Sequence, residues 1–494
     1  MKAIGFDNEK YIKIQSEQIR KRISEFGGKL YMEFGGKLFD DHHAARVLPG
    51  FAPDSKLNML LELKDRAEIV ISVSAISLAM EKKRRDLGIT YDLEVLRLID
   101  LFRSVGLYVG SVVITQYDGQ KAADKLKSRL EASGIPVFIH YMIPGYPSDV
   151  QRIVSDEGYG KNDYIKTTRE LIVVTAPGPG SGKMATCLSQ LYHENKMGIA
   201  SGYAKFETFP IWSIPLKHPV NLAYESATAD LNDVNMIDPF HYEAYGEVAI
   251  NYNRDVEVFP VLNEIFKQIY GQSPYKSPTD MGVNMAGFCI SDDEVVSEAS
   301  RQEIIRRYYG AVCDRLRNGN ETQEVEKISM IMNQAGIQLT DRNVVKSAIE
   351  TEQKTESPAM AISLHDGTMI TGKTKKLLGC SAAAVLNALK YLAGIDDKEE
   401  LLPPALIEPV QDLKVTFLGC KNPRLHVEEV LIALSVSAAN NQDAAKALSM
   451  LPKLAGCEAH STVILSSVDA DIFRKLNVNL TCEPQFQSKN LYHI

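Results

Sequence analysis

Hydrophobic and polar positions follow two alternating periods along the first 200 residues. Short apolar runs rich in Val and Ile, typical of buried strands, are separated by segments in which apolar residues recur every three or four positions, typical of amphipathic helices. The expected strands are residues 29–34, 68–74, 107–115, 135–141 and 170–175, and the expected helices include 92–105 and 120–132. This alternation predicts a largely parallel sheet with flanking helices on both faces.

The pattern changes twice further along the chain. Residues 198–254 are rich in aromatic residues, Pro, Asn and Asp and show little periodicity, whereas helical patterns dominate from 255 to 336, notably at 295–316 and 324–335. After residue 337 a smaller α/β pattern returns. Its expected elements are a hairpin at 359–371, helices at 381–393, 427–440 and 444–454, and strands at 413–418 and 461–466.

We therefore expect an α/β, multi-domain protein. The predicted domains are an N-terminal α/β domain with a largely parallel sheet (1–254), a central helical domain or cap (255–336) and a smaller C-terminal α/β domain (337–494). A chain of 494 residues with 45% hydrophobic and 24% charged residues can bury several cores of this kind.

Charge and cysteine usage narrow the class of protein. The net charge of −8 argues against non-specific nucleic-acid binding, and the short cluster Lys82-Lys83-Arg84-Arg85 is expected as a solvated helix face. The seven cysteines are dispersed without a C-x-x-C pair, which favours reduced thiols and no zinc knuckle. The N-terminus lacks a secretory signal, and the longest apolar stretch, 69–80, is too short to span a bilayer. We expect a cytoplasmic protein without membrane or nucleic-acid partners.

A glycine-rich segment follows the strand expected at 170–175. This glycine loop (residues 178–183) precedes a stretch with helical composition. A strand, a glycine loop and a helix N-terminus together form an anion site, because free amide groups and the helix dipole converge there. The predicted phosphate-binding residues are Gly178, Gly180, Ser181, Gly182, Lys183 and Thr186. The alternative is a tight strand-to-helix turn with a solvated lysine.

The glycine loop departs from the strict P-loop pattern at two positions. Pro177 stands where the first glycine belongs, and Met184 replaces the hydroxyl residue that holds Mg²⁺, so the nearest hydroxyl is Thr186. Residues 367–374 fit the pattern letter for letter, but Asp366-Gly367 is typical of a hairpin turn and β-branched residues follow it. We therefore expect a hairpin without a bound anion there. Cys187, one turn into the helix after the glycine loop, is expected as a buried packing residue.

Acidic and imidazole side chains gather between residues 227 and 243. Asp230, Asp238 and His241 are the candidates for a general base or a metal ligand. Their spacing fits neither an EF-hand nor a H-E-x-x-H helix, so the metal ligands stay unknown, and a divalent cation accompanying a nucleotide is the cofactor we consider. The alternative is a polar loop whose Asp residues cap helices and form turns.

A second gathering of polar residues lies near the N-terminus. Asp41 and His43 are candidates for proton transfer, and Arg46, together with the distant Arg254, could bind an anionic substrate. A salt-bridged loop is the alternative. The preceding Gly-Gly pair is similar to the first phosphate loop of amino-acid kinases, although that family has a lysine where this chain has Glu33.

Several long motifs resemble one family over the whole chain. Residues 34–51, 175–186, 227–240, 251–257 and 277–284 are similar to the signature of the bacterial uncharacterised protein family 0371. The resemblance implies a cytosolic bacterial protein with an N-terminal part and a smaller C-terminal α/β part. Some members carry the label ATP-dependent peptidase, but no catalytic dyad or ATPase motif set in this sequence supports that activity.

Two functions follow from these patterns. The first is an enzyme or binding protein that takes a nucleotide or another phosphorylated small molecule at the glycine loop. The alternative is a non-catalytic homo-oligomeric assembly or ligand-binding protein in which the glycine loop is only a tight turn. A homo-oligomer is expected in either case, because the apolar, alanine-rich stretch 430–439 must bury against its own sheet or a second subunit.

Overall fold

The computed structural model describes residues 3–84, 87–319 and 322–487. The chain forms two compact units, one of Ile4–Glu225 and Asn232–Ala299 and one mainly of Ser226–Leu231 and Ser300–Ile494. The boundary between them falls within helix α13 (Asp293–Asn318). The division into three domains at residues 254 and 336 stays a prediction. Across the described residues no helix has both the length and the apolar character needed to cross a bilayer.

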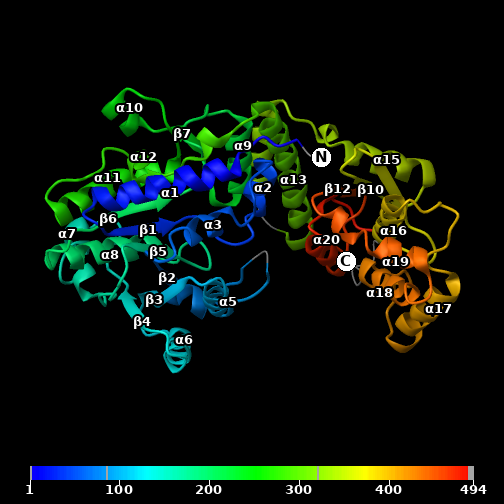
Figure 1. Cartoon of the computed structure of the whole chain (residues 1–494), viewed down its shortest axis with the longest axis horizontal. Coiled ribbons are helices and arrows are strands. Elements are labelled where there is room, and N and C mark those ends of the chain that lie inside the picture. Colours follow the sequence, from blue (N-terminus) through cyan, green and yellow to red (C-terminus); the bar gives the residue numbers. More distant parts are fainter. Residues whose placement is uncertain (1–2, 85–86, 320–321, 488–494) are drawn as a thin grey trace. The chain divides into compact units, whose positions relative to one another are not determined.

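A seven-stranded sheet forms the centre of the N-terminal unit (Figure 1). All of its strand pairs are parallel, and the strand order is β4-β3-β2-β5-β1-β6-β9. The strands are β1 (Leu30–Phe34), β2 (Ala67–Ser74), β3 (Tyr108–Tyr117), β4 (Val137–Tyr141), β5 (Leu171–Thr175), β6 (Gly202–Phe206) and β9 (Gly282–Val283). The parallel sheet and five of its strands are thus confirmed, whereas β6 and β9 were not predicted.

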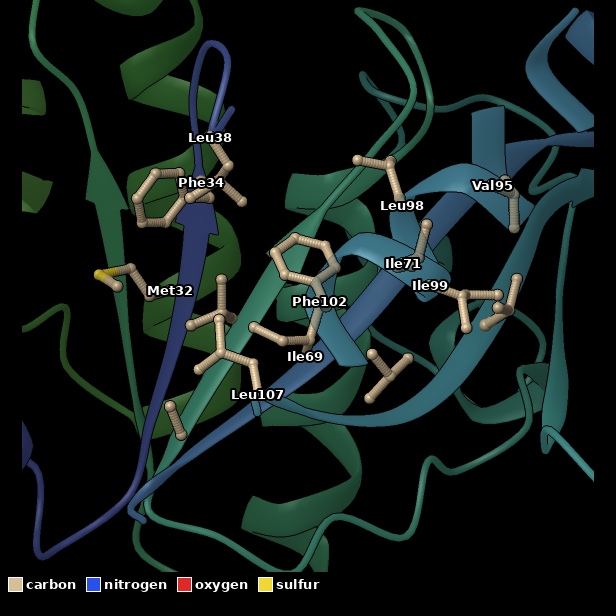
Figure 2. Packing of buried hydrophobic residues seen from close by; sticks show 14 of the residues in the cluster. Met32, Phe34, Leu38, Ile69, Ile71, Val95, Leu98, Ile99, Phe102 and Leu107 are labelled. Carbon is tan, nitrogen blue, oxygen red and sulfur yellow. The ribbon is translucent and has the colours of Figure 1, made fainter. Parts of the chain in front are cut away.

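Helices cover both faces of this sheet, which explains why β1, β2 and β5 are buried along their whole length. One face packs against helices α1 (Asn8–Glu25), α3 (Ser55–Leu61), α4 (Ala75–Ala79), α5 (Tyr91–Ser104) and α6 (Lys121–Ala132). Figure 2 shows Leu98, Ile99 and Phe102 of α5 directed towards Ile69 and Ile71 of β2. The opposite face packs against α8 (Lys183–Lys196) and α11 (Asn253–Tyr270).

The strand order places a topological switch point between β5 and β1. From β1 the chain continues through α3, on one face, to β2, whereas from β5 it continues through α8, on the other face, to β6. Adjacent strands whose connections leave on opposite faces open a crevice at their carboxyl ends, where ligands of such sheets bind. The glycine loop follows β5 and therefore lies at this edge.

The C-terminal unit contains a four-stranded sheet of order β11-β10-β12-β13. Its strands are β10 (Ala359–Ser363), β11 (Met369–Lys373), β12 (Glu458–Ser461) and β13 (Asn479–Cys482), and helices α15 (Asn343–Thr355) and α16 (Cys380–Ala393) pack on opposite faces. Strands β10 and β11 form an antiparallel hairpin in which Gly367 has φ +86°. The predicted hairpin is confirmed, and the absence of a bound anion at residues 367–374 stays a prediction.

Two strand predictions in this unit need correction. Residues 413–418 are not a strand: the π-helical turn η5 (Leu413–Phe417) continues helix α17 (Pro404–Asp412). Their alternating apolar residues do not reflect a buried face, since Leu413 and Phe417 are 50% and 74% exposed. The strand expected at 461–466 lies earlier in the chain: β12 occupies Glu458–Ser461 and shares only residue 461 with the predicted range.

The alanine-rich stretch predicted to bury an apolar face forms helix α18 (Val427–Ser437). Val430, Ala433 and Leu434 pack into the core of the C-terminal unit. Ile432 and Val436, on the other side of the helix, are 60% and 61% exposed. The helix therefore buries one side within its own unit, and oligomerisation stays a prediction.

Arg342 forms hydrogen bonds with residues of both β12 and β13. We predict that Arg342→Met destabilises the C-terminal unit. Its buried guanidinium donates to the carboxylate of Glu458, to Thr481 Oγ1 and to the carbonyls of Ala459 and Asn479. Removing one partner of a buried ion pair typically costs about 3–5 kcal/mol. We expect faster hydrogen exchange of the β12 and β13 amides. Lys346→Met, which removes an exposed cation on α15, should leave exchange unchanged, and equal exchange in both variants would contradict the prediction.

Candidate functional site

The glycine loop occupies the strand-to-helix position that the sequence predicts. It begins three residues after β5 ends and leads into α8, whose N-cap is Gly182 with φ +79°. No side chain caps this helix. Since the first amide groups of a helix have no partners within the helix, those of α8 point into the crevice edge without a capping side chain.

Packing explains two of the three glycines. A Cβ atom on Gly178 would lie 2.2 Å from the Tyr91 hydroxyl, and one on Gly182 would lie 2.8 Å from Thr115 Oγ1. Thr115 also donates a hydrogen bond of 3.0 Å to the carbonyl of Ser181, which fastens the glycine loop over β3. Gly180 differs, because its φ of +76° requires glycine while the space around it is open. The exposed tip of the glycine loop at Gly180 is thus free of packing contacts.

Lys183 points back over the sheet instead of into solvent. Its Nζ lies 3.7 Å from Glu33 Oε1 of β1, and the two side chains are only 16% and 10% exposed. A simple turn would leave this lysine solvated, so the alternative interpretation of the glycine loop does not describe this side chain. The distance is long for an ion pair, which leaves the ammonium able to approach a stronger anion.

Glu33 belongs to a charged row that crosses the sheet. Lys205 of β6 is its register partner, and both side chains project on the face covered by α8. Tyr203 donates a hydrogen bond of 2.8 Å to Glu33 Oε2. The Lys205 ammonium in turn contacts the carboxylate of Asp255 at the start of α11, and Glu207 Oε1 at 2.8 Å. We call Glu33, Lys205, Glu207, Tyr252 and Asp255 the acid–lysine network.

Burial and charge shape the protonation of this network. Burial by itself would lower the pKa of Lys205. The negative charges of Asp255 and Glu207 have the larger combined effect and raise the pKa of Lys205. Lys205 is therefore a permanent cation and a poor nucleophile. Burial raises the pKa of Glu207 above its usual value, although Lys205 opposes the shift. Tyr252 donates a hydrogen bond of 2.8 Å to Glu207. A carboxyl with a raised pKa in such surroundings is a candidate general acid or base.

Two of the predicted residues border the network through Tyr224. The centre of the His43 ring lies 6.4 Å from that of Tyr224. Burial raises the pKa of the Tyr224 hydroxyl. The charges of Glu207, Asp233 and Arg254 also act on this hydroxyl. Arg254 forms an ion pair of 2.9 Å with the buried Asp233. Lys183 contacts Glu33 of the network, whereas His43 and Arg254 are connected to it only through Tyr224.

Asp41, which follows β1, has partners in the next two helices, α2 (His42–Val47) and α3. Its carboxylate caps α2 by accepting from the Ala44 amide at 3.1 Å, and it pairs with the buried Lys56 at 2.7 Å. Burial would raise the pKa of Asp41, but the Lys56 ammonium holds it below its usual value. This geometry is that of the salt-bridged loop considered as the alternative. Arg46 lies partly buried in the last turn of α2.

The candidate residues predicted between 230 and 243 belong to two different units: Asp238 and His241 to one, and Asp230 to the other. Asp238 caps helix α10 (Pro239–Tyr245), accepting from the Phe240 and His241 amides, and it also accepts from Thr279. His241 Nδ1 lies 3.0 Å from Ser277 Oγ. Their contacts in the described structure are with α10, helix α12 (Pro278–Met281) and neighbouring aromatic rings. Asp230, in the turn η2 (Ala229–Leu231), belongs with the other unit.

Three further residues near the glycine loop can be placed. Thr186 is fully buried, and its hydroxyl donates 2.9 Å to the Gly182 carbonyl. Cys187 is buried as expected, and burial raises the pKa of its thiol well above its usual value. Lys82 does not lie on a helix face, contrary to the prediction for 82–85. Its ammonium lies 5.4 Å from the centre of the Tyr91 ring. The hydroxyl of the same tyrosine lies next to Gly178. Arg85 lies outside the described residues.

No ready-made metal site accompanies these groups. Among the residues that the structure describes, no three or more His, Cys, Asp or Glu side chains are placed to hold a metal ion. Lys205 lies between the carboxylates of Glu207 and Asp255, where a cation would otherwise sit.

Most of the acid–lysine network was not predicted from the sequence. Lys205 and Glu207 lie in a segment read as irregular, because a lysine in the middle of a strand breaks the apolar pattern. Glu33 was noticed only as a departure from the amino-acid kinases. The sequence did contain one signal for the network: Glu33 and Lys205 are charged residues near the carboxyl ends of two buried strands. Such ends lie at the same edge of a parallel sheet.

Two family profiles match most of the chain. The domain of unknown function DUF1846, N-terminal, matches residues 4–336, and the domain of unknown function DUF1846, C-terminal, matches residues 340–492. The chain is 58% identical over 490 residues to a UPF0371 protein of Corynebacterium aurimucosum, covering 99% of this chain and 98% of that protein. It is 56% identical over 492 residues to one of Streptococcus thermophilus, covering 100% of both. The resemblance found in the motifs is confirmed.

The raised pKa of Glu207 leads to a test of the network by its pH dependence. The folded chain binds this proton more tightly than the unfolded chain, so the stability that it contributes is present at low pH and is lost as pH rises through the raised folded pKa. We expect the unfolding free energy of the wild type to fall relative to Glu207→Gln as pH rises above the ordinary glutamate pKa of about 4.3. Urea unfolding followed by Trp212 fluorescence reports this unit, since Trp212 is the only tryptophan.

The control for this measurement is Glu131→Gln. Glu131 is about half exposed on α6, away from the network, and its replacement should leave the pH profile of the wild type unchanged. Parallel profiles for wild type and Glu207→Gln would show that Glu207 does not retain its proton on folding.

Proposed function

The chain belongs to the family built from the N- and C-terminal DUF1846 domains, and we propose that it binds a nucleotide or another phosphorylated small molecule at the glycine loop. The observation that carries the proposal is the position of Lys183. Its ammonium is largely buried, borders the uncapped start of α8 and lies 3.7 Å from Glu33. A cation held at a helix N-terminus beside a replaceable carboxylate is suited to a phosphate.

The phosphate would displace Glu33 as the partner of Lys183. The amide groups of the first turn of α8 and the open backbone at Gly180 would complete its coordination. These contacts fit the chemistry of an anion better than that of a neutral ligand.

The rest of the ligand would extend along the carboxyl ends of β1 and β6, towards the acid–lysine network. Glu207 is the residue there whose raised pKa suits proton transfer, and Tyr252 and Lys205 hold its carboxyl group in place. His43 and Arg254 border the same edge through Tyr224 and are the predicted residues best placed to contact a substrate. We propose on this basis that the protein acts on its ligand by acid–base chemistry, in the cytoplasm.

Binding of phosphorylated ligands tests this proposal directly. We predict that ATP, AMP and sugar phosphates, screened by calorimetry, will include a ligand whose affinity falls roughly 10- to 100-fold in Lys183→Ala, because a charge-assisted hydrogen bond contributes about 1.5–3 kcal/mol. Lys196→Ala is the matched control, since Lys196 lies in the last turn of the same helix and is 52% exposed.

An equal loss of affinity in both variants would mean that general charge, and not the glycine loop, binds the anion. If no phosphorylated ligand binds the wild type, the non-catalytic alternative is preferred. Light scattering then decides whether that alternative holds, since a clean monomer would exclude an assembly protein.

We also predict weaker Mg²⁺ dependence than in an ordinary P-loop enzyme. Met184 replaces the metal-binding hydroxyl, and the hydroxyl of Thr186 is already engaged with the Gly182 carbonyl. Removing Mg²⁺ with a chelator should therefore change the affinity by no more than about threefold. Mg²⁺-dependent ATP hydrolysis that survives Thr186→Ala would contradict this prediction.

A further inference from the structure

A groove of about 910 Å³ runs beside strand β11 in the C-terminal unit. Helix α15 and helix α16, on opposite faces of the sheet, supply its two walls. Apolar side chains line part of it: Leu377, Leu378, Ala383, Leu386, Leu402 and Ile407. Because β11 is the last strand of its sheet, the groove follows an open strand edge.

The hydrogen-bonding register shows which backbone groups of β11 face the groove. The Thr374 amide donates 2.8 Å to the Pro358 carbonyl, and the Leu364 amide donates 2.9 Å to the Thr368 carbonyl. Pairing alternates along an antiparallel ladder, so every second residue faces the neighbouring strand. The main-chain groups of Met369, Thr371 and Lys373 therefore point away from β10, and Thr371 and Lys373 line the groove.

One of these groups already has a substitute partner. The side-chain amide of Asn387, on α16, donates a hydrogen bond of 2.9 Å to the Thr371 carbonyl. It occupies the position that an N–H group of a further strand would take. The outward N–H groups of Thr371 and Lys373 are the complementary donors. Repeated backbone groups at this spacing match another polypeptide better than a small molecule.

Charge differs between the two ends of the groove. Lys373 ends β11 and the exposed Lys375 and Lys376 follow it. At the other end, Lys390 is held by the carbonyls of Asp397 and Glu399 at 2.7 Å, so its charge is already solvated by the chain. Asp397, Glu399 and Glu400 line this end of the groove. An extended partner would be complementary if it placed acidic residues beside Lys373–Lys376.

We propose that the edge of β11 binds an extended polypeptide segment of about five or six residues, with acidic residues at the end next to Lys375 and Lys376. The segment would add a fifth strand to the sheet and place alternate apolar side chains in the groove. This binding is independent of the phosphate site. Exposed edges otherwise favour aggregation, and the competing explanation is that the lysines only protect the edge against it.

The test selects ten-residue peptides from a random phage-displayed library on the full-length protein and measures the synthesised peptides by fluorescence anisotropy. We expect the selected peptides to alternate β-branched residues and to carry Asp or Glu at one end. Thr371→Pro removes an outward N–H and should weaken binding at least about tenfold, whereas Thr371→Val keeps the amide and should bind within about threefold of the wild type.

Two further measurements do not depend on the proline variant folding. The double variant Lys375→Glu/Lys376→Glu should lose about 5- to 20-fold in affinity at low salt, with Lys346→Glu on the exposed side of α15 as control. Peptide binding to the wild type should slow hydrogen exchange at Thr371 and Lys373. Failure to select peptides, selection of basic peptides, or protection confined to other strands would overturn the proposal and leave edge protection as the role of the lysines.

Discussion

The ammonium group of Lys205 organises the carboxyl edge of the main sheet. A buried cation is tolerated only where carboxylates surround it, and Glu207, which follows β6, and Asp255 of α11 provide them. This requirement fixes the start of α11 against the sheet and brings Tyr252 onto Glu207. The glycine loop meets the same edge through Lys183 and Glu33. The buried charge of Lys205 therefore joins β6 to α11, and the neighbouring pair Lys183–Glu33 joins α8 to β1, at the place where the topology opens a crevice.

The arrangement differs from that of a P-loop enzyme although both contain a glycine loop, a lysine and a helix N-terminus. In a P-loop the hydroxyl after the lysine holds a metal ion, and here that position is Met184. The strict sequence match at 367–374 folds as a hairpin whose Gly372 packs against the backbone of α16, where a Cβ atom would come within 2.2 Å of the Ala384 amide nitrogen. Structural context, more than the pattern of letters, decides whether a glycine segment forms a loop before a helix or the turn of a hairpin.

The sequence was informative where one physical effect dominated. Five buried strands were predicted from uninterrupted apolar runs, and helix α5 from its apolar stripe, because burial on two faces or one face sets those patterns. The acid–lysine network escaped prediction because it depends on strand register: Glu33 and Lys205 are 172 positions apart along the chain and become neighbours only when β6 pairs with β1. The strand predicted at 413–418 was wrong. Apolar residues alternate there as in a strand, but the segment forms a π-helical turn instead of pairing with a sheet.

The charges at this edge do not balance, which constrains how any anion can enter. Two ammonium groups, Lys183 and Lys205, face the three carboxylates of Glu33, Glu207 and Asp255. A phosphate dianion added to this set would increase an existing negative excess in surroundings that screen charge poorly. Without a bound metal, the simplest compensation is a proton taken up with the ligand, and Glu207 is the group prepared to accept it. Ligand binding would then consume protons, so its measured heat would vary with the ionisation enthalpy of the buffer.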